Sequence, residues 1–101
     1  MRRGTTPALV LTVDADIVGW TVYVTIEKGG REITLENDRL TMSYANSKTT
    51  IELALTQEET LSLSPGTCEI QVRAINDGTA IATDIETIDV GRILLEGVIN
   101  E

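Results

Sequence analysis

The sequence predicts an all-β domain, an antiparallel sandwich of about seven strands with one short helical turn around Thr56–Leu63. Three observations lead to this prediction. Apolar and polar residues alternate with a period of two in several short segments. Gly, Asn and Asp residues that favour turns separate these segments at regular spacing. The 101 residues give room for one core, and abundant Val, Ile and Thr favours strands. A β-barrel is the alternative architecture.

The N-terminal part of the chain predicts two strands and a hairpin. We expect residues 1–6 to form a flexible arm and residues 7–101 to form the single domain. Ala8–Val13 is a short apolar strand that follows Pro7. Trp20–Glu27 alternates cleanly, with Trp20 and every second residue after it facing inward. The pair Gly29-Gly30 then allows the positive φ angles of a tight hairpin.

Three further alternating segments follow the hairpin. They are predicted as strands over Glu32–Glu36, Leu40–Tyr44 and Thr49–Leu55. Asn37-Asp38 turns the chain between the first two, and Ala45–Ser47 forms a loop between the second and third. Their inward residues are aliphatic, which agrees with a chain that has no Phe.

The helical turn is predicted from a capping box. The Thr56 hydroxyl can accept the Glu59 N–H, and the Glu59 carboxylate can reach back to the Thr56 N–H. Pro65-Gly66 ends this segment after one or two turns. We expect Leu61 and Leu63 to close the open end of the core.

The C-terminal half contains the longest predicted strand, Thr67–Asn76. Asp77-Gly78 supplies the two positive-φ positions of a type I′ hairpin turn. Ala80–Thr83 and Glu86–Val90 form the return strand, with an expected bulge or bend near Asp84.

The charge distribution disfavours nucleic acid as a partner, and the apolar runs are too short for membrane insertion. The net charge is −8, and all of this excess lies in residues 51–101, whereas residues 1–50 are balanced. A nucleic-acid-binding domain needs a basic surface. No apolar run approaches the roughly 20 residues that span a bilayer, and no signal peptide is recognisable.

The residues that carry most enzyme chemistry are absent or isolated. The chain has no His, and the single Cys68 cannot form an intrachain disulfide or a zinc site. Asp14-Ala15-Asp16 lacks the Gly and the terminal Glu of a calcium loop. Glu58 and Glu59 are explained by the helix start rather than by a catalytic pair. We therefore expect no enzymatic activity, no cofactor and no metal.

Protein–protein contact is the remaining class of function. Tyr23 and Arg73 occupy outward positions of long strands, and both residue types are common at interfaces. The C-terminal segment is more apolar than a free tail needs, so it either completes the sandwich or packs on a neighbouring subunit. The possible interaction surface therefore comprises Tyr23, Arg73, Leu94, Leu95, Val98 and Ile99.

A series of short motifs follows in a fixed order along the chain. The first is the loop Asp16-Ile-Val-Gly19, which precedes the early strand that runs to Ile26. The later motifs are Leu55-Thr-Gln-Glu-Glu-Thr60, Leu63, Gly66, Glu69-Ile-Gln-Val-Arg73, Asp77-Gly-Thr-Ala80 and Ala82-Thr83. In this order and spacing the motifs resemble the N-terminal domain of phage baseplate upper proteins, and the resemblance covers roughly residues 8–95.

The resemblance implies an immunoglobulin-like domain in a virion structural protein of a phage or prophage tail baseplate. Such a protein is made in the bacterial host cytoplasm and acts in the virion through contacts with other baseplate proteins, and it can form a homo-oligomer. Family members usually continue into a longer chain, whereas this sequence stops at Glu101. That difference favours a small prophage structural protein or an excised domain. The alternative is a generic immunoglobulin-like interaction module of a bacterial surface or secreted protein.

Overall fold

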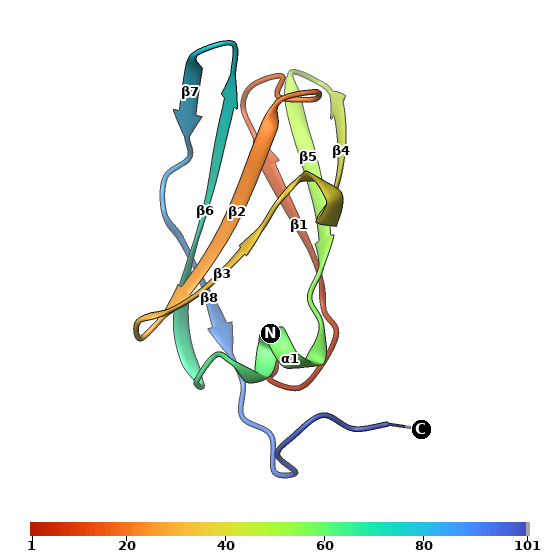
Figure 1. Cartoon of the computed structure of the whole chain (residues 1–101), viewed down its shortest axis with the longest axis vertical. Coiled ribbons are helices and arrows are strands. Elements are labelled where there is room, and N and C mark those ends of the chain that lie inside the picture. Colours follow the sequence, from red (N-terminus) through yellow and green to blue (C-terminus); the bar gives the residue numbers. More distant parts are fainter. Residues whose placement is uncertain (101) are drawn as a thin grey trace.

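The computed structural model describes residues 1–100 and contains two antiparallel sheets that form a sandwich (Figure 1). The strands of the smaller sheet are, in spatial order, β1 (Ala8–Val13), β5 (Lys48–Ala54) and β4 (Leu40–Ala45). The larger sheet runs β3 (Arg31–Leu35), β2 (Thr21–Lys28), β6 (Gly66–Asn76), and then β7 (Thr79–Ala82) and β8 (Glu86–Val90), which both pair with β6. The predicted all-β sandwich is confirmed, with eight strands in residues 1–100.

The eighth strand arises because the return strand is split in two. β7 pairs with the later half of β6 and β8 pairs with its first half. Between them, the Thr83 N–H donates to the Val72 carbonyl at 2.9 Å, and the Val72 N–H donates to the Thr83 hydroxyl at 3.0 Å. The bend predicted near Asp84 is therefore present, and Thr83 satisfies the backbone of β6 where the ladder is interrupted.

Both predicted tight hairpins are confirmed. Lys28 pairs with Arg31 across Gly29-Gly30, and Asn76 pairs with Thr79 across Asp77-Gly78. All four turn residues have positive φ, which includes 48° at Asp77. These turns match the right-handed twist of the strands that they join.

The core is aliphatic and lies between the two sheets. The alternation predicted for β2 and β6 is confirmed, whereas Trp20, just before β2, is only half-buried. The buried residues on the inner faces of these strands are Val22, Val24 and Ile26 of β2 and Cys68, Ile70, Val72 and Ala74 of β6. Leu63 is fully buried and Leu61 is half-buried, so the end of the helix and the segment after it do cover one end of the core. The buried apolar residues are Val13, Ile17, Val22, Val24, Ile26, Leu35, Ile51, Leu53, Leu55, Leu63, Cys68, Ile70, Val72, Ala74 and Val90.

The helical turn α1 (Gln57–Leu61) begins at the predicted capping box. The Glu59 N–H donates to the Thr56 hydroxyl at 3.2 Å, and the Thr56 N–H donates to the Glu59 carboxylate at 2.8 Å. The turn predicted at Asn37-Asp38 is a short 3-10 helix, η1 (Asn37–Arg39). Neither helix is long enough to cross a lipid bilayer, and no other is found in residues 1–100.

The N-terminal arm, which we expect to be flexible, makes hydrogen bonds to two distant parts of the chain. Arg2 forms a parallel bridge with Gly91, and the Arg3 N–H donates to the Gly91 carbonyl at 3.1 Å. The hydroxyl of the buried Thr60 donates to the Thr5 carbonyl at 3.0 Å. The arm is held because the chain just after β8 and the end of α1 both offer it hydrogen-bonding partners, and these partners come from distant parts of the sequence.

Candidate interaction surface

The six residues proposed for the interaction surface lie in two separate regions. Tyr23 and Arg73 are register partners on the outer face of the larger sheet. Together with Ile75, Ala80 and Ile81 they line a shallow depression of about 270 Å³ near the β6–β7 hairpin. This hairpin is at the opposite end of the molecule from the C-terminal tail (Figure 1). The sandwich therefore does not bring the two sets together.

The C-terminal tail, residues 91–100, does not complete the sandwich. Leu94 is 93% exposed, Leu95 72%, Ile99 57% and Val98 48%. Among the large apolar residues of the described tail, only Ile93 is half-buried, and it lies close to Gly4 and Leu61. Of the two expectations for this segment, completion of the core is therefore wrong within the chain as described.

The tail is nevertheless fixed to the domain by polar contacts. The Ile99 N–H donates to the Gln57 side-chain oxygen at 2.9 Å, and the Gln57 side-chain NH₂ donates to the Ile99 carbonyl at 3.0 Å. The Gln57 amide thus satisfies the backbone of Ile99 as a neighbouring strand would. This double contact holds the tail against α1.

Arg3 makes the second attachment of the tail. Its guanidinium donates to the carbonyls of Leu63 at 2.7 Å and Leu61 at 3.0 Å, just where α1 ends. Another nitrogen of the same group, Nη1, forms an ion pair with Glu96 and donates to both carboxylate oxygens, at 2.7 and 3.0 Å. One side chain therefore joins the N-terminal arm, the end of α1 and the tail. Sequence reasoning missed this role because the arm was expected to be loose.

Near the tail, α1 is held by a second ion pair. Arg39 donates to the Glu59 carboxylate at 2.7 Å. Partial burial would raise the pKa of Glu59, but the hydrogen bonds from Arg39 and Thr56 outweigh it and hold the pKa below its ordinary value. The pKa of Arg39 is raised by the same contact with Glu59. Glu59 is thus a charged cap and not a proton donor for chemistry at neutral pH.

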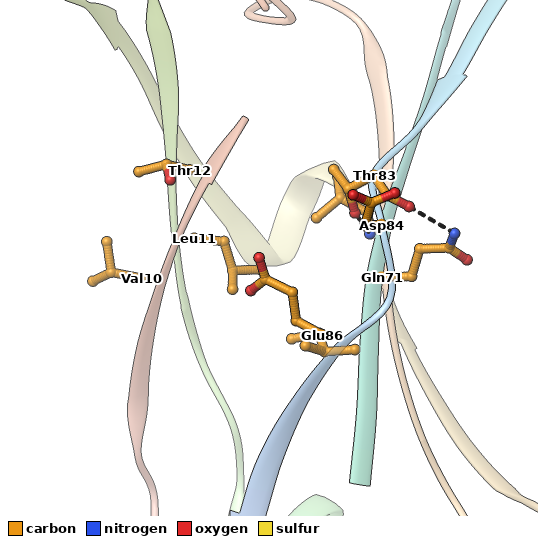
Figure 2. A pocket seen from close by; sticks show the side chains of 9 residues that line it. Val10, Leu11, Thr12, Gln71, Thr83, Asp84 and Glu86 are labelled. Atoms are coloured by element: carbon orange, nitrogen blue, oxygen red, sulfur yellow. Dashed lines mark hydrogen bonds between the residues drawn. The ribbon is translucent and has the colours of Figure 1, made fainter. Parts of the chain in front are cut away.

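A small cavity opens where β1 faces the interruption between β7 and β8 (Figure 2). Asp84 lies in the interruption and Glu86 is the first residue of β8, and Val10 and Leu11 lie opposite them on β1. The volume of about 120 Å³ is well below the roughly 300 Å³ at which pockets for small organic ligands begin. The cavity is therefore a gap at the open side of the sandwich.

Within residues 1–100, no group of three or more His, Cys, Asp or Glu side chains is placed to hold a metal ion. The prediction that Cys68 is buried is confirmed, and burial raises the pKa of its thiol. Asp14, from the sequence that begins like a calcium loop, is exposed and lies 3.6 Å from the ammonium of Lys48.

A scan of the sequence against models of known protein families gives no match, and a search of characterised proteins gives no significant relative. The resemblance to baseplate upper proteins therefore stays a prediction from the motifs.

Proposed function

We propose that this chain is a non-enzymatic structural protein that acts through protein–protein contacts of its C-terminal tail. The observation that carries the proposal is the exposure of Leu94, Leu95, Val98 and Ile99 on a segment whose backbone is already fixed at Gln57 and Arg3. Fixing a segment costs conformational entropy, and burial of these four side chains offsets little of that cost because each is about half or more exposed. An exposed apolar surface of this kind is typical of a contact surface.

The size of the surface indicates what kind of contact it makes. If a partner covered the exposed parts of these four aliphatic side chains, the burial would contribute on the order of 4–8 kcal/mol of favourable free energy to association. Association itself costs an estimated 4–15 kcal/mol or more. One tail therefore supports only weak pairwise binding, and repeated contacts in a symmetric assembly would make it effective.

The setting that we propose for this assembly is the tail baseplate of a phage or prophage virion. The ordered motifs between Leu55 and Thr83 support this setting through their resemblance to baseplate upper proteins. Partners would then be other baseplate proteins, and the domain would be one of several packed subunits.

The proposal is tested with virions from the strain that encodes the chain. After prophage induction, particles are purified and their proteins are quantified by mass spectrometry, with the expectation that this chain is present in stoichiometric amount. The L94S/L95S variant should be lost from the particles. The matched control is V10S, which removes a comparably exposed apolar side chain from β1 and should be retained. Particles without the wild-type chain would exclude the baseplate role.

A further inference from the structure

We propose that the tail of one copy packs on the acidic outer face of the larger sheet of a second copy, so that identical chains associate through two different surfaces. This inference rests on the proposed role of the tail as a contact surface and names its partner. The charge of the tail end, the row of carboxylates on the sheet and the exposed apolar residue beside that row lead to it.

The end of the molecule that carries the tail differs in charge from the rest. Residues 1–6 and 91–100 lie side by side there. Together with Glu101, which lies outside the described residues, these segments contain three arginines and two glutamates, a net charge of +1. Residues 7–90 contain five basic and fourteen acidic residues, a net charge of −9. Two tails that met each other would bring like charges together, and exposed Arg2 and Arg92 would oppose that contact. A tail that met the body of another copy would bring opposite charges together.

The receiving face is identified by three carboxylates in one row. Glu27 on β2 is the register partner of Glu32 on β3 and of Glu69 on β6, so all three side chains lie on one outer face of the sheet. Register partners have Cβ atoms about 4.5–5.5 Å apart, where like charges destabilise a sheet. In the described part of the chain none of the three joins an ion pair, although Glu27 accepts one backbone hydrogen bond from Gly30.

The basic residues nearest to this row do not lie on its face. Lys28 and Arg31 form the next register pair, so their side chains alternate to the other side of the sheet. Arg73 does lie on the same outer face, four residues from Glu69 along β6, but it forms no ion pair with the row. The repulsion within the row is therefore not compensated by an ion pair on the same chain. Arg92 or Arg2 of a second copy would supply one.

An apolar residue next to the row provides the other half of the contact. Ile85, in the interruption between β7 and β8, is 57% exposed. It borders a groove of about 210 Å³ that the row and Thr25 and Gln71 also line. Leu94 and Leu95 follow Arg92 by only two and three positions in the sequence. The tail thus presents a cation and aliphatic side chains to a groove that presents carboxylates and an aliphatic side chain.

Because the two surfaces differ, the contact is heterologous. Repetition of such a contact gives a closed ring when the rotation between copies closes and an open filament when it does not. In either case each copy uses its tail once and its sheet face once.

The experiment is light scattering on the full-length chain over a range of concentrations, at about 20 mM and about 500 mM NaCl, because screening shortens the reach of exposed charges from about 20–30 Å to less than 5 Å. At low salt the mass should rise above the 11.0 kDa monomer with concentration, and high salt should shift the equilibrium toward monomer. A strict monomer at every concentration and salt would overturn the inference.

Two double variants then test the surfaces. The tail variant L94S/L95S and the face variant E27Q/E69Q should each weaken self-association about tenfold or more. The face variant relieves like-charge repulsion, so its melting temperature should be equal to or above that of wild type, which separates a lost contact from a lost fold. The control E52Q removes an exposed carboxylate from the outer face of the smaller sheet and should associate like wild type.

Mixing the two variants decides between the possible contacts. The tail variant retains an intact face and the face variant retains an intact tail, so an equimolar mixture should form a 1:1 heterodimer with wild-type affinity. Wild-type association by the face variant alone would overturn the assignment of the receiving face, and failure of the mixture to associate would overturn the heterologous contact.

The two proposals can fail separately. A chain that is found in particles but is monomeric in solution would retain the baseplate role and lose the self-association. A chain that associates as described but is absent from particles would lose the baseplate role alone.

Discussion

The carboxylate of Glu96 accepts two hydrogen bonds from the guanidinium of Arg3, at 2.7 and 3.0 Å, across 93 positions of sequence. This pair connects the first residues of the domain to its apolar tail. The Arg3 guanidinium also donates hydrogen bonds to the carbonyls of Leu61 and Leu63 at the end of α1. Arg3 therefore contributes more to the stability of the fold than Glu96 does.

The contacts of Arg3 and Glu96 predict that E96Q and R3A lower the free energy of unfolding by different amounts. E96Q removes a mostly exposed charge and should lower the free energy of unfolding by at most about 1 kcal/mol. R3A also leaves the Leu61 and Leu63 carbonyls without their partner and should cost about 1–3 kcal/mol more. Urea unfolding measures both values. In hydrogen exchange, the tail amides should exchange faster in both variants, and equal stability of the two variants would contradict the assigned role of Arg3.

The lowered pKa of Glu59 predicts that the free energy of unfolding depends on pH. Its pKa in the folded protein lies below the ordinary value of 4.5, so the folded state favours the charged form. This contribution is complete above the pKa of the unfolded chain and disappears as the pH falls through the lower pKa of the folded protein. The difference in unfolding free energy between wild type and E59Q should therefore be constant at neutral pH and shrink in acid. The control E58Q changes the neighbouring exposed carboxylate, and an identical pH profile for both variants would exclude the Arg39–Glu59 pair as the cause.

Substitution by Asp should have different effects on stability at the neighbouring positions Val72 and Arg73. Val72 is buried between the sheets and Arg73 faces solvent on the next position of β6. V72D would bury an unpaired carboxylate, which costs roughly 3–5 kcal/mol and removes much of the stability of a small domain. R73D should change stability little. Thermal melting followed by circular dichroism checks both, and an unchanged curve for V72D would contradict the inward direction of Val72.

The burial of Cys68 predicts that its thiol reacts slowly with a disulfide reagent in the native protein. The residue is buried on β6, and burial raises the pKa of its thiol, so little reactive thiolate is present at neutral pH. Its reaction with a disulfide reagent should follow global unfolding, and addition of denaturant should accelerate it by orders of magnitude. Rapid labelling of the native chain would show that this end of β6 opens locally.

Local patterns of the sequence were sufficient for the strands, the turns and the helix cap. The alternation in Thr67–Asn76 identified the buried face of β6 because successive side chains of a strand point to opposite sides. Asp77-Gly78 identified its hairpin, and Thr56 with Glu59 identified the start of α1, because each of these features depends on neighbours within about four residues.

The contacts between distant segments could not be read in the same way. The sequence by itself determined which faces of the strands are apolar and where the chain turns, because those properties follow from neighbouring residues. Only the tertiary structure decided that Arg3 holds the tail, that Leu94 and Leu95 remain exposed, and that Glu27, Glu32 and Glu69 share one row. The physical reason is that strand register and the docking of termini depend on pairings between residues far apart in the chain, which no local pattern encodes.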